Sequence, residues 1–317
     1  MKKLGLILLL SAFFLAFFAL AQSSGTVEGE VLNGSAENKP ISGITVTLHI
    51  FDSSGTEKGT LTALTDEQGY FAFKGLDTGK DLFYLAEVNF QGVLYHSSAL
   101  SFTEGEEKLR LPVVAYETTE SDSEIAVQKA HFIFAVAPDR KTIEVMEMYS
   151  VANNGRKTFV TKDGKTLRFP IPPEAMDFVS DSLNPEGGEA VLTEPILPGP
   201  MPQPLTLGYV LPVRGDSLEI RRSVFYPVES YNVLVKDTGL TVEVPGTKRG
   251  RNVETAGDVY LNFEGEKLPK GGEITVKLSG LEKASKVQVG GTTWVLATTV
   301  AVVLALLGLF LVYLRRR

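Results

Sequence analysis

Short stretches of alternating apolar and polar residues fill most of the chain between its two apolar ends. One stretch runs from Thr26 to Leu32 and another from Ile44 to Ile50, with the turn-forming pairs Asn33-Gly34 and Ser54-Gly55 behind them. Because side chains alternate between the two faces of a strand, this period of two is typical of half-buried β-strands. No apolar pattern with the 3.6-residue helical period has a useful length between them. The pattern therefore predicts an all-β fold.

Further strands are predicted in two groups. The first group adds Tyr70 to Phe73, Phe83 to Phe90, Leu100 to Phe102 and Lys108 to Tyr116. The second group comprises Ile125 to Ala137, Thr142 to Val151, Lys157 to Val160, Thr166 to Ile171, Thr206 to Leu211, Ser217 to Tyr226, Tyr231 to Val235, Leu240 to Val244, Val259 to Phe263 and Glu273 to Leu278. The acidic stretch from Glu117 to Ser123 separates the groups. We expect two antiparallel β-sandwich domains, over residues 22–117 and 118–280, and the second region is long enough for one domain or two.

A proline-rich segment interrupts the second group of strands. Residues 195–204, the Pro-rich loop, contain five prolines. Since proline cannot donate a main-chain hydrogen bond, such a stretch is excluded from the centre of a sheet. We expect a stiff surface loop in the polyproline II conformation, with a PxxP-type ligand for a protein partner as the alternative.

The N-terminal residues 1–21 have the pattern of a secretory signal peptide. Lys2 and Lys3 precede an apolar run from Leu4 to Ala19, and the small residues that follow predict cleavage between Ala21 and Gln22. An uncleaved N-terminal anchor is the alternative. Either would direct the following residues across a membrane.

The C-terminal end predicts one transmembrane helix over residues 294–314. This segment has no charged residue, and about 20 helical residues span a hydrocarbon core about 30 Å thick. Trp294 and Tyr313 lie near the two expected interfaces, and the chain then ends in Arg315, Arg316 and Arg317. Because basic residues favour the cytoplasmic side, we expect a cytoplasmic tail (315–317), a stalk (281–293) and an extracytoplasmic remainder, on a cytoplasmic or plasma membrane.

Charge and cysteine content narrow the function further. Five of the 31 basic residues lie at the two ends, which leaves 26 basic and 38 acidic residues, a net charge of −12, between them. An acidic surface disfavours nucleic acid and anionic lipid headgroups as partners. The chain has no cysteine, which excludes disulfides, thiolate metal sites and thiol catalysis, so the fold depends on core burial.

Three motifs follow one another in the first group of strands: Gly29-Glu30-Val31, Pro40 to Leu48, and Leu64 to Phe73 followed by Gly75-Leu76. Asp66 and Gly69 would form a tight turn there, after which Phe71 and Phe73 would point into the core. With these motifs, residues 25 to about 116 resemble the carboxypeptidase regulatory-like domain, a transthyretin-like β-sandwich. The resemblance implies that fold and brings no catalytic residues with it.

The residues that could take part in catalysis or bind a metal do not form a catalytic set. The histidines His49, His96 and His131 lack the spaced partners of a metal pair or a triad. Met146-Glu147-Met148 places two thioethers on one strand face and Glu147 on the other, with His131 on the neighbouring predicted strand. Met146, Met148 and His131 are therefore candidate ligands for Cu(I), against the interpretation that the methionines face inward as core residues.

Two acidic clusters, Glu104 to Glu107 and Asp122 to Glu124, do not match an EF-hand loop. A weak Ca²⁺ site is the alternative to ordinary solvated turns. We expect no cofactor. Asn33-Gly34-Ser35 fits the N-glycosylation pattern.

These features predict a non-catalytic, single-pass membrane protein of the cell envelope that binds or scaffolds another exported or membrane protein. The alternative is an accessory subunit of an envelope assembly process, either secretion or the maturation of cytochromes or metal centres. A hydrolase without a recognisable motif is the third hypothesis.

Overall fold

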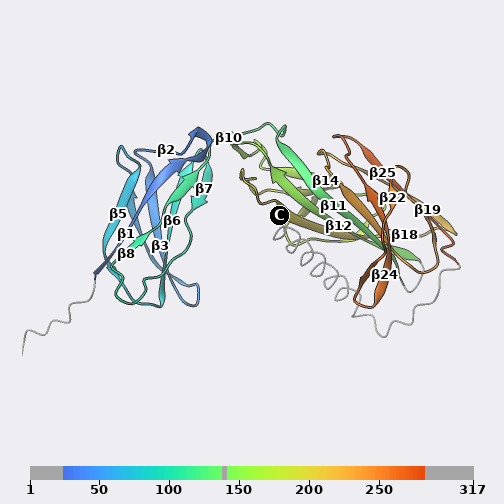
Figure 1. Ribbon diagram of the computed structural model, residues 1–317, viewed down its shortest axis with the longest axis horizontal. Helices are drawn as coiled ribbons and strands as arrows, with labels where there is room; N and C mark the ends of the chain where they lie inside the picture. The colour runs from blue at the N-terminus through green and yellow to red at the C-terminus, as the bar shows by residue number, and fades with distance from the viewer. Residues whose placement is uncertain (1–23, 138–140, 283–317) are drawn as a thin grey trace, which may run out of the picture. The chain divides into compact units, whose positions relative to one another are not determined.

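The computed structural model describes residues 24–137 and 141–282 (Figure 1). The chain divides into two compact units, with the boundary between Glu117 and Thr118. Nearly all regular structure in the described residues is β-strand, and the helix there is the 3-10 turn η1 (Gly34–Ala36). The prediction of an all-β fold is confirmed.

The predicted signal peptide, its cleavage site at Ala21 and Gln22, and the predicted transmembrane helix with its flanking residues lie outside the described residues. Within residues 24–137 and 141–282, no helix combines the length and apolar character needed to cross a membrane. Export, anchoring and topology therefore stay predictions.

Unit 1, which the structure describes over residues 24–117, contains two sheets. One has the order β2-β1-β5 with β8 and β9 also paired to β1, and the other has the order β4-β3-β6-β7. The strands are β1 (Ser24–Asn33), β2 (Lys39–Pro40), β3 (Thr45–Asp52), β4 (Glu57–Leu64), β5 (Tyr70–Asp77), β6 (Leu82–Phe90), β7 (Val93–His96), β8 (Lys108–Arg110) and β9 (Val113–Ala115).

The turn before β5 has the predicted chemistry. The Asp66 carboxylate accepts hydrogen bonds from the main-chain N–H groups of Gln68 and Tyr70, both at 2.9 Å. Gly69 has a φ of 73°, a conformation that L-residues with a Cβ rarely adopt. Beyond the turn, Phe71 and Phe73 are buried as expected, 2% and 6% exposed.

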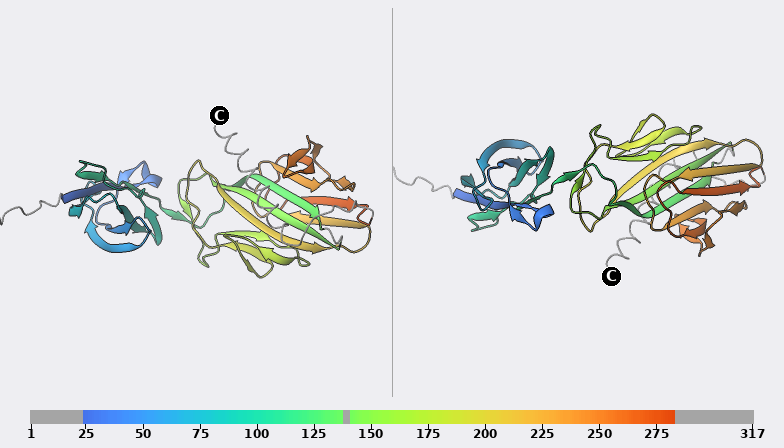
Figure 2. Two further views of the ribbon diagram at one scale, coloured as in Figure 1. Left: turned by 90° about the horizontal axis from the view of Figure 1, so that it is seen from below. Right: turned by 90° about the horizontal axis from the view of Figure 1, so that it is seen from above.

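Unit 2, described over residues 118–137 and 141–282, has a larger set of sheets. An eight-stranded sheet has the order β15-β18-β12-β11-β20-β24-β22 with β23 on β24, and smaller sheets have the orders β14-β17-β16, β19-β25-β21 and β10-β13 (Figures 1 and 2). The strands are β10 (Thr118–Thr119), β11 (Ile125–Val136), β12 (Thr142–Asn153), β13 (Thr158–Phe159), β14 (Leu167–Pro170), β15 (Met176–Val179), β16 (Asn184–Glu186), β17 (Glu189–Leu192), β18 (Gln203–Pro212), β19 (Ser217–Ser223), β20 (Tyr231–Lys236), β21 (Thr241–Glu243), β22 (Lys248–Arg249), β23 (Val253–Thr255), β24 (Asp258–Gly265) and β25 (Glu273–Ser279).

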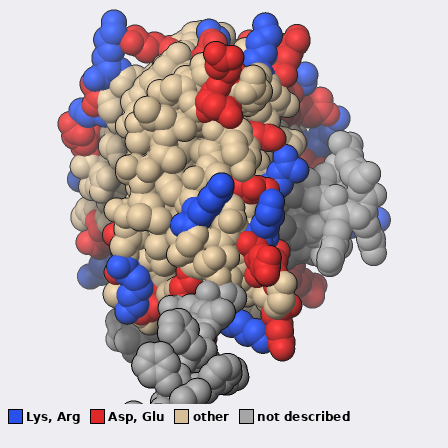
Figure 3. Space-filling model, turned by 90° about the vertical axis from the view of Figure 1, so that its left-hand side faces the viewer, with Lys and Arg blue, Asp and Glu red and all other residues tan. Residues whose placement is uncertain are grey.

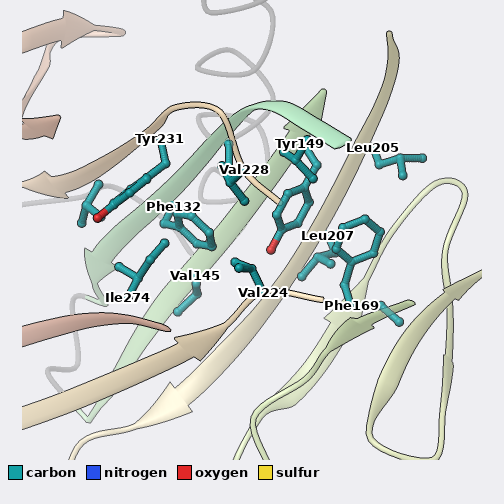
Figure 4. Packing of buried hydrophobic residues seen from close by; sticks show 14 of the residues in the cluster. Phe132, Val145, Tyr149, Phe169, Leu205, Leu207, Val224, Val228, Tyr231 and Ile274 are labelled. Atoms are coloured by element: carbon teal, nitrogen blue, oxygen red, sulfur yellow. The ribbon is translucent and has the colours of Figure 1, made fainter. Parts of the chain in front are cut away.

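One apolar cluster joins the eight-stranded sheet of unit 2 to its smaller sheets. Phe132, Val145 and Leu207 come from the eight-stranded sheet, whereas Phe169 comes from β14 and Ile274 from β25 (Figure 4). All five side chains are no more than 3% exposed. Because both sets of strands bury the same cluster, the hydrophobic effect holds the sheets together.

The sequence predicted antiparallel sheets, but several strand pairs are parallel. β1 pairs in parallel with β8 and β9, β10 with β13, and β11 with β20. In the last pair, Ala130 to Phe134 run alongside Tyr231 to Val235, 101 residues later in the chain. Parallel partners need long connections, and local alternation does not report them.

The Pro-rich loop ends earlier than predicted, because Gln203 and Pro204 begin β18. Pro204 pairs with Ser150 of β12, whereas β15 pairs with β18 only further along, at Gly208 and Val210. A proline is tolerated at the start of a strand where the other edge is unpaired.

The predicted stalk, residues 281–293, includes a residue that belongs to the folded unit 2. Leu281 is 1% exposed and belongs to the apolar cluster of unit 2. The N–H groups of Gly280 and Leu281 donate to the Asp216 carbonyl at 3.0 and 3.2 Å.

The predicted strand from Leu100 to Phe102 is also wrong, because it forms only an isolated bridge between Leu100 and Tyr84.

Charge does not collect in a patch of one sign on the face drawn in Figure 3. Lysine and arginine side chains there are interspersed with aspartate and glutamate (Figure 3). The acidic excess of the sequence is therefore not concentrated on this face.

Close packing requires glycine at Gly29, the first residue of the G-x-V motif. A Cβ atom there would lie 2.4 Å from the Leu111 carbonyl oxygen and 2.7 Å from Cζ of Phe71. Gly29→Ala should lower the free energy of unfolding by about 1–3 kcal/mol, as overpacking does. Gly59→Ala on β4 is the control, since no atom lies within 4 Å of its new Cβ, and should change that free energy by less than about 0.5 kcal/mol. Guanidinium unfolding followed by circular dichroism measures both, and equal effects would contradict the packing argument.

Candidate functional site

Glu147 is a fully buried carboxylate in unit 2, with 0% exposure. It lies on β12 between Val145 and Tyr149, and these three alternate side chains all face the apolar cluster. The methionines on either side occupy the opposite face of the strand, because strand side chains alternate. The predicted alternation is confirmed, with Glu147 on the face of this apolar cluster. Met148 lies on the other face of β12, buried with Ile133, Leu234 and Tyr260 in a second apolar cluster against which Met146 packs.

The partner of Glu147 is Arg222, which is 3% exposed and comes from β19 on a different sheet. Nε of Arg222 lies 2.6 Å from Oε1 of Glu147, and Nη2 donates to Oε2 at 2.8 Å. Nη2 also donates to the Pro170 carbonyl at 2.6 Å. Two tyrosine hydroxyls complete the cluster, since Tyr209 donates to Oε1 at 2.5 Å and Tyr149 donates to Oε2.

Burial and charge fix the protonation states of this cluster. Burial by itself would lower the pKa of the Arg222 guanidinium, but the Glu147 charge and the two tyrosines outweigh it and raise that pKa above its usual value. Burial first, and the Glu147 charge second, raise the pKa values of Tyr149 and Tyr209 well above the usual value for tyrosine. Both hydroxyls therefore remain protonated donors. The cluster is closed to solvent and connects two sheets through internal contacts.

A cleft of about 420 Å³ opens elsewhere in unit 2, within the size range of binding pockets. It is called the unit 2 cleft below, and its lining mixes aromatic rings with charges of both signs. The lining residues are Glu120, Asp122, Phe159, Thr161, Lys165, Thr166, Arg168, Val224, Phe225, Tyr226, Lys270 and Gly271.

The cations of the cleft are held by carboxylates. Lys270 Nζ lies 2.6 Å from Asp122, Lys165 Nζ lies 2.5 Å from Glu186, and Arg168 contacts both Asp163 and Glu189. These pairs are at least partly exposed and are therefore weak. A charged group on a ligand can compete for either member.

Two hydroxyl groups of the cleft have internal roles. The Tyr226 hydroxyl accepts a hydrogen bond from the Arg168 main-chain N–H at 3.1 Å, and burial raises its pKa. The Thr166 hydroxyl donates toward the main-chain carbonyls of Leu192 and Glu194, at 3.0 and 2.6 Å. The cleft lining contains no histidine, serine or cysteine.

The Pro-rich loop is fixed to the wall of this cleft. Ile196 exchanges two main-chain hydrogen bonds with the cleft residue Phe159, at 2.9 and 3.0 Å, and is 2% exposed. Nδ2 of Asn153 donates to the Ile196 carbonyl at 2.9 Å. Beyond this anchor, Leu197 is 50% exposed and Met201 is 86% exposed. The loop therefore presents two apolar side chains on a fixed base.

The structure brings the Cu(I) candidates to one face of the eight-stranded sheet. His131 lies directly across from Met148, and Met146 lies across from Ile133. Burial first, and Lys129 second, lower the pKa of His131 to about 4. Nδ1 of His131 is buried and has no hydrogen-bond partner within the described chain. The Cu(I) site stays a prediction.

The acidic clusters have local partners. Glu106 accepts hydrogen bonds from the N–H and the hydroxyl of Thr103, both at 2.9 Å, and Asp122 pairs with Lys270. Across the described ranges, no three His, Asp or Glu side chains stand ready around a point where a metal ion could be held. The weak Ca²⁺ site therefore gains no support beyond the sequence.

Sequence reasoning missed both the Glu147–Arg222 pair and the unit 2 cleft. The alternation of Ile143, Val145, Tyr149 and Val151 was the signal that Glu147 faces inward. No sequence signal identified the cleft, whose lining comes from residues between 120 and 271.

No protein-family model matches the sequence, and no curated protein matches it. Among solved structures, the crystal structure of a 9R-lipoxygenase from Cyanothece PCC8801 aligns with a TM-score of 0.21 at 13% identity. The alignment covers 30% of this chain and 16% of the lipoxygenase chain. A similarity of this extent carries no argument about fold or function, so the resemblance to the carboxypeptidase regulatory-like domain stays a prediction.

The buried pair can be tested through stability. Arg222→Met leaves the Glu147 carboxylate buried without its cation and should lower the free energy of unfolding by about 3–5 kcal/mol. Glu147→Leu combined with Arg222→Met should recover at least about half of that loss, because apolar replacement of both partners removes the unpaired charge. Lys248→Met is the control, since Lys248 and Glu266 are 83% and 86% exposed. Urea unfolding measures the three variants, and a similar loss for Arg222→Met and Lys248→Met would refute the role of the pair.

Proposed function

We propose that this protein is a non-catalytic binding module of the cell envelope, anchored by one transmembrane helix. Each unit would be a β-sandwich, and unit 2 would bind an extended segment of another exported or membrane protein. The observation that carries the proposal is the unit 2 cleft together with the Pro-rich loop attached to its wall.

The chemistry of the cleft suits a polypeptide ligand. Phe159, Phe225 and Tyr226 offer apolar and aromatic surface, and cations and carboxylates lie beside them. Apolar side chains of a ligand would bury against the rings, and its charged groups would compete for the exposed ion pairs. Leu197 and Met201 would extend the contact beyond the cleft, since exposed apolar groups on a stiff loop cost little entropy to order.

The chemistry of the cleft also favours binding over catalysis. A hydrolytic site needs an activated nucleophile within hydrogen-bonding reach of a base. Thr166 directs its hydroxyl to main-chain carbonyls, and no histidine lines the cleft. The two lysines and the arginine are held by carboxylates.

The anchor would limit the position of unit 2. Unit 2 contributes Leu281 to its core, and residues 283–293 separate the described chain from the predicted span. At a maximum of about 3.6 Å per residue, these residues reach at most about 40 Å. A partner would therefore be a membrane protein or an exported protein close to the bilayer.

The alternative, an accessory subunit that handles a metal or haem during envelope assembly, is favoured by one observation, the pairing of His131 with Met148. Metal analysis of the purified full chain after loading with Cu(I) discriminates between the two. The alternative requires bound copper that is lost in Met148→Leu.

The binding surface can be tested by crosslinking. A photoreactive residue at position 201 should form a discrete adduct in cells, and the same residue in place of Leu94, an exposed apolar residue of unit 1, should not. Phe225→Ala should reduce the adduct at least about tenfold, in line with the loss of a buried aromatic contact. An adduct that forms equally at both positions, or one that Phe225→Ala leaves unchanged, would contradict the proposal.

A further inference from the structure

Two histidines and two glutamates meet on one face of the four-stranded sheet of unit 1. Glu87 on β6 lies directly across from His96 on β7. His49 on β3 lies across from Leu85, one diagonal step from Glu87. Such diagonal neighbours are within reach of long side chains on the same face of a sheet. Glu57 of β4 approaches His49 from its other side.

Contacts to Glu57 orient the His49 ring. Nδ1 of His49 lies 2.6 Å from Oε1 of Glu57, so the Nδ1 proton is donated to this carboxylate. In a neutral imidazole, the other nitrogen then carries the lone pair. That nitrogen, Nε2, is shielded from solvent and has no hydrogen-bond partner among the described residues. It faces Oε1 of Glu87 at 3.7 Å.

With His49 neutral in this tautomer, the arrangement brings lone pairs together. The carboxylate of Glu87 lies between Nε2 of His49 and Nδ1 of His96, which is 3.5 Å from its Oε2. In the described chain, the ion pairs of Glu57 and Glu87 involve only these two histidines and no lysine or arginine. A cation shared by the donor atoms would turn a repulsive arrangement into an attractive one.

We propose that His49, Glu87 and His96 bind one divalent transition-metal ion of the Zn²⁺ class. Two imidazoles and a carboxylate form a common three-ligand set for zinc, with water in the fourth position. Ligands at about 2.0–2.1 Å from a tetrahedral ion lie about 3.3 Å from each other, and here the nitrogens of His49 and His96 approach the two different oxygens of Glu87 at 3.7 and 3.5 Å. Imidazole nitrogen selects such metals over Ca²⁺ and Mg²⁺, which prefer oxygen ligands.

Binding requires a small rearrangement. The side chains as they stand do not surround one point. The side chain of His96 is 46% exposed and that of Glu87 is 23% exposed, so both can rotate without disturbing the core. His49 is already held by Glu57, which acts as the positioning carboxylate behind a metal-bound histidine.

The test uses the full chain, purified in detergent without a histidine tag and treated with a chelator. Calorimetric titration with ZnCl₂ should show one ion bound per chain. Glu87→Gln and His96→Ala should each weaken the affinity for Zn²⁺ at least about tenfold. Glu57→Gln should weaken it about tenfold, at the low end for a positioning residue. Glu30→Gln on β1 is the matched control, because Glu30 is a partly exposed strand glutamate that pairs with Arg110, and it should leave the affinity unchanged.

Titration with CuCl₂ adds a spectroscopic measurement that would not change if His96 had only a structural role. The electron paramagnetic resonance spectrum should show coupling to two imidazole nitrogens, and His96→Ala should remove one of them. No Zn²⁺ binding in the wild-type chain would overturn the proposal. Affinity that His96→Ala and Glu87→Gln leave unchanged, or that His131→Asn abolishes instead, would overturn it as well.

Discussion

The fold of unit 2 depends on burying a carboxylate and a guanidinium together. Glu147 comes from the eight-stranded sheet and Arg222 from the sheet β19-β25-β21, so neither charge can leave water until both sheets have assembled. Desolvating either ion alone costs several kcal/mol. A shift of β12 by one residue would turn a methionine inward in place of Glu147 and leave Arg222 unpaired, so the pair also specifies the register.

Aromatic rings connect this pair to the unit 2 cleft. Tyr149, which donates to Glu147, stacks on Phe169 with ring centroids 4.4 Å apart. Phe169 in turn lies 6.1 Å from the ring of Tyr226, a cleft residue. Interiors packed at this density transmit strain and do not deform smoothly. A chain of aromatic rings therefore runs from the buried charges to the cleft wall, although no charged group of the cluster lines the cleft.

Local alternation was sufficient to predict the all-β class but neither every strand nor the pairing. Strands with regular alternation and one buried face, such as β1 and β3, were predicted to within a few residues. β4, with the sequence Glu57 to Leu64, is largely exposed on both faces and has no such alternation. The short strands β16 and β22 are wholly exposed and are defined only by their neighbours. The parallel pair of β11 and β20 depends on contacts between residues 101 positions apart.

Dependence on contacts between distant residues also explains why the sequence did not predict the two sites. Met146-Glu147-Met148 alternates in either orientation, and hydropathy favours methionine for the interior. In the structure both faces of β12 are buried, Met148 on one and Glu147 on the other. Arg222, 75 residues away, supplies the cation that makes the inward carboxylate favourable. His49, Glu87 and His96 are also distant in sequence, and only the order β3-β6-β7 brings them to one face.

The two carboxylates at these sites differ in what their surroundings allow. Glu147 has a guanidinium and two hydroxyl donors and no exposure, so a new partner from solvent cannot reach its carboxylate. Glu87 is partly exposed and faces histidine nitrogens at 3.5 and 3.7 Å, beyond hydrogen-bonding distance. A buried group that no new partner can reach can only stabilise the fold that surrounds it. An unsaturated group at the surface can exchange partners, and this is the physical requirement for binding an ion from solution.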